Sequence, residues 1–314
     1  MARSTSSPVA ASGTADHAVP GRSLALDLLL SLRPAQWTKN LLVFAGVLFG
    51  RRLFDLASVA AAVSAFAVFC ALSGVVYLVN DITDRESDRQ HPIKAKRPIA
   101  SGALPVPTAL AVAIVLGICG LAGAVALGGP FAIVAAAYVA LQLAYSFSLK
   151  HIVIIDVLTI AVGFVLRAVA GAEAVHVNIS NWLLVCTILI ALFIGLAKRR
   201  HEIVLLAGGA TSHRPILGEY SAYLLDQMIG VVTASTLISY IFYTISPETQ
   251  AKFGTQWLGL TIPFPLYGIF RYLYLVHLRE GGGSPADLLL TDRPLLACVA
   301  LWALAVALII YRPV

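Results

Sequence analysis

Long apolar runs separated by short polar breaks fill the chain from about residue 41 to its end. A transmembrane helix needs about 20 mainly apolar residues to cross roughly 30 Å of hydrocarbon. Runs that approach this length lie near residues 38–55, 57–80, 106–127, 130–149, 152–174, 181–200, 222–246, 255–278 and 293–312. The pattern therefore predicts an all-α, polytopic membrane protein whose nine transmembrane helices form one domain, residues 24–314.

The composition supports this assignment and excludes other classes of protein. Hydrophobic residues make up 59% of the chain and charged residues only 12%, against roughly a quarter charged in a typical soluble domain. The net charge of +6 therefore needs no nucleic-acid partner. Residues 1–23 are rich in Ser, Ala, Gly and Pro, and we expect them to form a disordered cytoplasmic tail. The four cysteines stand singly in different apolar runs, so neither a disulfide framework nor a Cys metal site is predicted.

Basic residues are distributed unequally between the two sides of the predicted bundle. One side receives the amino-terminal segment, the polar loop after residue 80 and the basic run at 198–200. The other side receives only Arg51, Arg52, Lys252 and Arg312. By the positive-inside rule, the amino terminus and the polar loop lie in the cytoplasm.

The polar loop begins with the sequence NDITDRESD, residues 80–88, directly after the second apolar run. On one continuous helix, Asn80, Asp81, Asp84 and Asp88 would lie within an arc of about 100°. Mg²⁺ prefers one or two carboxylates together with water and substrate phosphate. The spacing therefore predicts a Mg²⁺ site that holds a diphosphate at the membrane surface. The alternative is an ordinary solvated loop, which this shared face disfavours.

The sequence HPIKAKRP, residues 91–98, follows this acidic helix end. Its two prolines favour a loop that can fold back over the motif. Its basic residues Lys94, Lys96 and Arg97 would then lie over phosphate oxygens that the metal leaves unneutralised. Together the acidic and basic stretches suit the release of a pyrophosphate.

NDITDRESD followed by HPIKAKRPIASG resembles the first aspartate-rich motif of the UbiA superfamily of intramembrane prenyltransferases. Other segments resemble the decaprenyl-phosphate phosphoribosyltransferase branch of that superfamily: LRPAQWTKNLLVFAGVLF (32–49), YSFSLKHIVIIDV (145–157), GFVLRAVAGA (163–172), ISNWLL (179–184) and LAKRRHE (196–202). The resemblance implies nine helices around a central cavity, with Mg²⁺ and a diphosphate at its cytoplasmic end. It also implies location in the bacterial inner membrane.

The resemblance to this branch further implies transfer of 5-phosphoribose from phosphoribosyl pyrophosphate to a polyprenyl phosphate, which supplies a precursor of cell-wall arabinan. The acceptor phosphate is already an anionic nucleophile, so the reaction needs alignment and a stabilised leaving group but no general base. Asp84 and Asp88 are the expected catalytic residues. The expected metal ligands are Asn80, Asp81, Asp84, Asp88 and Asp156, and the expected substrate-binding residues are Lys39, Arg85, Lys94, Arg97, Tyr145, Lys150 and Arg167.

Arg167 is predicted within an apolar span, where an isolated guanidinium is costly. It must therefore line a polar cavity or pair with a buried acid such as Asp156, which lies eleven positions earlier on nearly the same helical face.

Two other functions stay open at this point. One is a prenyltransferase that moves a polyprenyl group from its diphosphate to an aromatic acceptor. The other is a membrane transporter or lipid carrier, since charges within membrane spans also mark transport pathways. The expected partners are phosphoribosyl pyrophosphate, a polyprenyl phosphate and the membrane, and association into a homo-oligomer stays open.

Overall fold

The computed structural model describes residues 23–91, 93–205, 215–278, 288 and 291–311. All but the last residue of the predicted tail lie outside this part of the chain, as does Pro92. The described elements are α1 (Leu24–Ser31), η1 (Pro34–Phe44), α2 (Ala45–Phe49), α3 (Leu56–Thr83), α4 (Arg85–Gln90), η2 (Lys94–Lys96), α5 (Pro98–Ser101), α6 (Val106–Leu127), α7 (Gly129–Phe147), η3 (Leu149–His151), α8 (Ile155–Ala174), α9 (Asn181–Leu205), η4 (Pro215–Glu219), α11 (Ala222–Ile245), α12 (Pro247–Phe253), η5 (Trp257–Thr261), α13 (Pro263–Leu278) and α15 (Arg293–Ile310).

Seven helices of the described chain are long and apolar enough to cross a membrane: α3, α6, α7, α8, α9, α11 and α15. The predicted all-α, multi-pass architecture is therefore confirmed, whereas the count of nine spans is not. The predicted span at 38–55 is divided between the 3-10 segment η1 and the short helix α2. The predicted span at 255–278 is divided between η5 and the 16-residue helix α13, which is only about 24 Å long.

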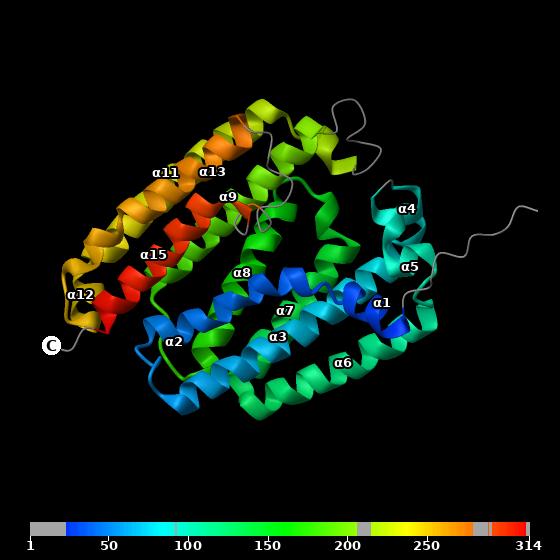
Figure 1. Ribbon diagram of the computed structural model, residues 1–314, viewed down its shortest axis with the longest axis horizontal. Coiled ribbons are helices and arrows are strands. Elements are labelled where there is room, and N and C mark those ends of the chain that lie inside the picture. Colours follow the sequence, from blue (N-terminus) through cyan, green and yellow to red (C-terminus); the bar gives the residue numbers. More distant parts are fainter. Residues whose placement is uncertain (1–22, 92, 206–214, 279–287, 289–290, 312–314) are drawn as a thin grey trace, which may run out of the picture.

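Helix α8 lies at the centre of the bundle (Figure 1). It packs against α7, α3, η1 and α2 on one side and against α9 on the other. Of the residues in its most apolar 18-residue stretch, 56% are buried, compared with 17% for the corresponding stretch of the peripheral helix α6. Polar side chains on α8 are therefore held inside the protein rather than in lipid.

Two glycines bring the η1–α2 segment into backbone contact with α8. A Cβ atom on Gly171 would lie 1.9 Å from the carbonyl oxygen of Val43, and one on Gly46 would lie 2.5 Å from the carbonyl oxygen of Gly171. Small residues allow helices to approach this closely inside a membrane. The contact places the side chains of η1 directly beside those of α8.

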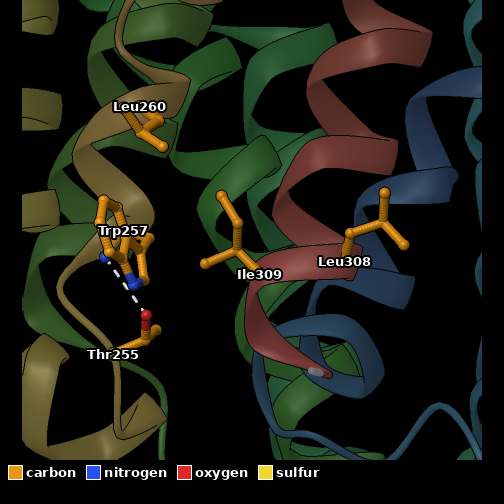
Figure 2. Close-up of a pocket in the computed structure, with 5 residues that line it drawn as sticks. All are labelled: Thr255, Trp257, Leu260, Leu308 and Ile309. Carbon is orange, nitrogen blue, oxygen red and sulfur yellow. Dashed lines mark hydrogen bonds between the residues drawn. The ribbon is translucent and has the colours of Figure 1, made fainter. Parts of the chain in front are cut away.

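An apolar pocket opens between η5 and the end of α15, lined by Thr255, Trp257, Leu260, Leu308 and Ile309 (Figure 2). Just beyond α15, the ring of Tyr311 stacks edge-on against Phe54, near the start of α3. The aspartate-rich motif lies at the other end of this 28-residue helix, about 40 Å away. The pocket is therefore separate from the predicted site.

Candidate active site

The aspartate-rich motif spans the junction between α3 and α4. Helix α3 ends at Thr83 and α4 begins at Arg85, so the continuous helix assumed for residues 80–88 is wrong at Asp84. The Thr83 hydroxyl donates back to the carbonyl oxygen of Val79, a contact that often bends helices. The backbone bonds Asp84 N–H to Asn80 O (2.9 Å) and Asp88 N–H to Asp84 O (2.8 Å) still bridge the break. The side chains therefore keep nearly helical directions.

Asp81 and Asp88 share one arginine from the following loop. Arg97 Nη1 lies 3.0 Å from Asp81 Oδ1 and 2.6 Å from Asp88 Oδ2. The predicted return of the basic loop over the motif is therefore confirmed for Arg97. Lys94 Nζ lies 4.0 Å from Asp88 Oδ1 on the same side. The two carboxylates are nearly inaccessible, with exposed fractions of 2% and 3%.

Arg33 adds a second guanidinium to Asp81 from the loop that precedes η1. Its guanidinium carbon also lies 4.8 Å from the centre of the Tyr77 ring, within range of a cation–π contact. Burial lowers the pKa of Arg33, and the Asp81 carboxylate opposes this shift. An arginine stays protonated at neutral pH in any case, so Asp81 is neutralised from two directions.

Asp84 is the most open of the three motif aspartates, with 30% of its side chain exposed. Its oxygens lie 3.0 and 3.2 Å from Nζ of Lys150, which is carried by the short turn η3 between α7 and α8. Asn80 is half-buried one helical turn before Asp84. The structure thus brings Lys150 to the motif as predicted, although 66 residues separate it from Asp84.

Arg85 points away from this group. Its Nε donates to the carbonyl oxygen of Ile99 at 3.3 Å, and Arg89 Nε donates to that of Ala100 at 3.0 Å. These contacts fasten α4 to α5. The visible contact of Arg85 is therefore structural, and its expected contact with substrate stays a prediction.

Asp156 is fully buried at the start of α8. Its Oδ2 accepts from Arg199 Nε on α9, and its Oδ1 accepts from the hydroxyl of Tyr220, each at 2.8 Å. Arg199 also lies 3.4 Å from the hydroxyl of Tyr145 at the end of α7. The alternative that paired Asp156 with Arg167 is wrong, because Arg199 occupies that place.

Arg167 lies deeper in the bundle and is only 5% exposed. Its three nitrogens donate to Asn40 Oδ1 on η1, to the carbonyl oxygen of Gly163 and to the hydroxyl of Tyr138 on α7. Sequence reasoning required a polar environment for Arg167 but missed Asn40 and Tyr138 as its partners. Asn40 follows Lys39 directly, and this polar pair inside an apolar run was an available signal.

The motif has the donor chemistry that a magnesium ion needs. Within the described residues, no three His, Cys, Asp or Glu side chains converge as a complete metal cage. Mg²⁺ does not require one, because it binds through one or two carboxylates and completes its shell with water and substrate phosphates. Asp84, partly exposed and next to the Asn80 amide, fits this mode. Asp81 and Asp88 meet the guanidinium of Arg97 instead.

Comparison with known proteins agrees with this geometry. The UbiA prenyltransferase family matches residues 40–291. The decaprenyl-phosphate phosphoribosyltransferase of Corynebacterium glutamicum is 33% identical over 93% of this chain and 89% of its own length. That of Mycobacterium tuberculosis is 35% identical over 90% of this chain and 94% of its own length.

A solved UbiA homolog from Archaeoglobus fulgidus, bound to GPP and Mg²⁺, superposes with a TM-score of 0.69 at 19% identity. That alignment covers 90% of this chain and 99% of the homolog, which shows the shared fold. The match to the family, the extent of the curated relatives and the aspartate-rich motif at the mouth of the bundle agree. This chain belongs to the UbiA prenyltransferase family.

Proposed function

We propose that this protein transfers 5-phosphoribose from phosphoribosyl pyrophosphate to a polyprenyl phosphate, such as decaprenyl phosphate, and releases pyrophosphate. The observation that carries the proposal is the mixed charge at one end of α3. There each motif carboxylate lies against a Lys or Arg side chain. The names of the relatives at 33% and 35% identity support the choice of donor and acceptor.

The proposed reaction exchanges one bond at C1 of the ribose. An oxygen of the acceptor phosphate attacks C1, the bond from C1 to the pyrophosphate oxygen breaks, and pyrophosphate leaves with the electron pair. The attacking oxygen is already anionic, so the protein has to align the substrates and stabilise the leaving group. No proton has to be removed from the nucleophile.

The residues of the motif have different tasks in this proposal. Asp84 and Asn80 would hold Mg²⁺, which when bound neutralises charge on the departing pyrophosphate. Asp88 and Asp81 hold Arg97 and Arg33 at the same opening. Arg97, with Lys94 and Lys150, can then turn from carboxylate to phosphate oxygens as the substrate enters. Arg guanidinium groups bind phosphates well because they offer parallel N–H donors.

Asp156 was expected to be a metal ligand, but we propose a structural role for it. Its oxygens are engaged by Arg199 and Tyr220 in a fully buried position. We infer that it fixes the start of α8 beside Tyr145 at the end of α7 and Lys150 on η3, rather than binding Mg²⁺ directly.

The proposed orientation places the motif at the cytoplasmic face of the bacterial inner membrane. The basic residues near the motif support it through the positive-inside rule, and so does the water-soluble donor. A single cysteine placed at exposed Glu86 should react with an impermeant maleimide only in inverted vesicles. Reaction in right-side-out vesicles instead would reverse the orientation.

The function is tested with purified protein, Mg²⁺, labelled phosphoribosyl pyrophosphate and polyprenyl phosphate. A parallel reaction receives labelled prenyl diphosphate and 4-hydroxybenzoate, because an aromatic prenyl transfer is the rival that membership of a prenyltransferase family leaves open. We expect labelled lipid product only in the first reaction. Product in the second reaction alone would replace the proposal with the rival. Movement of lipid without any covalent product would favour a carrier.

A further inference from the structure

Two consecutive arginines connect the end of α9 to two different helices. Arg199 Nε donates to Asp156 Oδ2 on α8 at 2.8 Å. Arg200 turns to α11, where its Nε contacts Asp226 Oδ1 and its Nη2 lies 3.4 Å from Asp226 Oδ2. Successive residues on a helix point about 100° apart, so the two side chains reach different neighbours. The pair on α8 is buried, whereas the pair on α11 is open to water, with exposed fractions of 16% and 36%.

A histidine from a third helix also contacts Asp226. His277 Nε2 on α13 lies 3.3 Å from Asp226 Oδ1, and its Nδ1 lies 2.9 Å from the carbonyl oxygen of Leu273. A carboxylate and a carbonyl oxygen only accept hydrogen bonds, and a neutral imidazole has a single N–H group. In the neutral ring, one nitrogen lone pair would therefore face an oxygen lone pair. The imidazolium has two N–H groups, so only the protonated ring makes both contacts as hydrogen bonds.

The elements around α13 direct His277 to this carboxylate. Helix α13 packs against α11, α15 and η5. Asp226 is the one charged residue of α11, and η5 has none. At the start of α15, Asp292 accepts from Arg271 Nη2 at 2.9 Å and Arg293 is exposed. In the described part of the chain, Asp226 is therefore the acid that faces His277.

These contacts connect to the candidate active site through α9 and η4. Arg199, next to Arg200, also lies 3.4 Å from the hydroxyl of Tyr145. Tyr220, just before α11, donates to Asp156 Oδ1 at 2.8 Å. Helices α8, α9 and α11 are therefore joined to one another at the end of the bundle that carries the aspartate-rich motif. The histidine adds α13 to this group.

We propose that His277, Asp226 and Arg200 form a proton-dependent clamp, which fixes the end of α9 beside the active site. With His277 protonated, the shared carboxylate ties α13 to α9 and α11. As the pH rises through the range in which histidines titrate, about 5 to 8, the ring loses a proton and one of its two hydrogen bonds. Stability from the clamp is therefore present at low pH and lost at high pH. The effect of the clamp on catalysis rests on the proposed function, whereas the clamp itself does not.

The stability test compares the native protein with His277→Gln, which cannot take up a proton. The native Tm should exceed that of His277→Gln by about 2–4 °C at about pH 5.5. The two values should converge by about pH 8.5. The control is His176→Asn, at an exposed position with a φ of 53° that Asn tolerates, and its Tm difference should not vary with pH in this way. No difference for His277→Gln, or one that does not shrink as the pH rises, would overturn the clamp.

Hydrogen exchange tests whether the clamp acts on α9. After correction for intrinsic exchange, the protection of amides 198–204 in the native protein should fall by roughly three- to ten-fold between about pH 5.5 and pH 8.5. In His277→Gln it should be low at both values. Amides 185–195 of the same helix are the internal control and should keep their protection. Equal protection of 198–204 in the two proteins at low pH would contradict the proposal.

The kinetic test uses Asp226→Asn, which removes the shared carboxylate. We expect kcat to fall by roughly ten-fold at a temperature well below the Tm, with each KM within about two-fold, because the change misplaces α9 without removing a substrate contact. Asp226→Glu should recover part of the rate, and Glu248→Gln, exposed on α12, should match the native protein. A lower Tm with a native kcat would remove the positioning role. Absence of transfer by the native protein, with the stability and exchange patterns intact, would remove the proposed function and leave the clamp.

Discussion

Substitution of Asp156 tests whether this residue stabilises the fold or binds metal. The Asp156→Asn variant keeps the shape of the side chain but removes its charge. Asp156 is 0% exposed and Arg199 only 2%, so the change leaves a guanidinium buried beside a neutral amide. Removing one partner of a buried ion pair costs about 3–5 kcal/mol.

The neighbours of Arg199 place the expected cost within that range. Arg199 Nη1 still contacts Glu202 at 2.8 Å, and the Glu202 side chain is 24% exposed. This remaining acid offsets part of the loss, so we expect the lower end, about 3 kcal/mol. By the scaling of soluble domains, that corresponds to a fall in Tm of roughly 6–12 °C.

The assay is thermal unfolding in detergent, followed with a dye that reacts with the buried thiols of Cys70 and Cys298 as they become accessible. The control is Arg52→Met, which removes a 3.8 Å pair with Asp55 whose two side chains are 52% and 43% exposed. Such an exposed pair contributes at most about 1 kcal/mol. The control should therefore shift the Tm by far less than Asp156→Asn.

A double-mutant cycle with Arg199→Met isolates the contact between the two residues. The double variant should be more stable than the sum of the single effects predicts, with a coupling of roughly 2–3 kcal/mol. Additive effects, or a Tm of Asp156→Asn within 2 °C of the native value, would refute the argument. A native Tm combined with weaker Mg²⁺ binding would instead make Asp156 a metal ligand.

Three further outcomes follow from the structure. Asp84→Asn should lower the rate of phosphoribose transfer by at least about a hundred-fold, because it removes a contact to the metal and the leaving group. The control Glu86→Gln, at an exposed position, should leave the rate within two-fold. Similar rates for the two variants would contradict the role of Asp84. Chelation of divalent ions should abolish transfer reversibly, and Mg²⁺ should restore it; activity that persists after chelation would exclude metal dependence. Gly171→Ala should lower the free energy of unfolding by about 1–3 kcal/mol, and with it the Tm, because the added Cβ would clash with the carbonyl oxygen of Val43. Gly230→Ala, whose added Cβ would face open space, should leave the Tm unchanged or raised.

Local patterns in the sequence were sufficient to predict the class of the protein and the aspartate-rich part of the candidate site. The hydropathy runs predict the seven long helices, because crossing a membrane imposes a minimum apolar length on each. The count of nine is not confirmed, since among the described residues Pro263 and the 3-10 geometry of η1 divide two runs that are continuous in composition. The spacing of Asp81 and Asp88 correctly predicts a shared direction, because helix geometry depends only on near neighbours.

The tertiary structure alone decided which charges meet. Asp156 and Arg167 were the obvious buried pair by helical spacing, yet Arg199 takes the acid from another helix. Arg167 instead contacts Asn40, 127 residues earlier in the chain. Helical spacing describes one helix at a time, whereas the partner of a buried charge depends on the depth and rotation of the helices around it. The close backbone contact at Gly171 sets that depth for η1, and so determines where the positive charge inside the bundle is left without an acid.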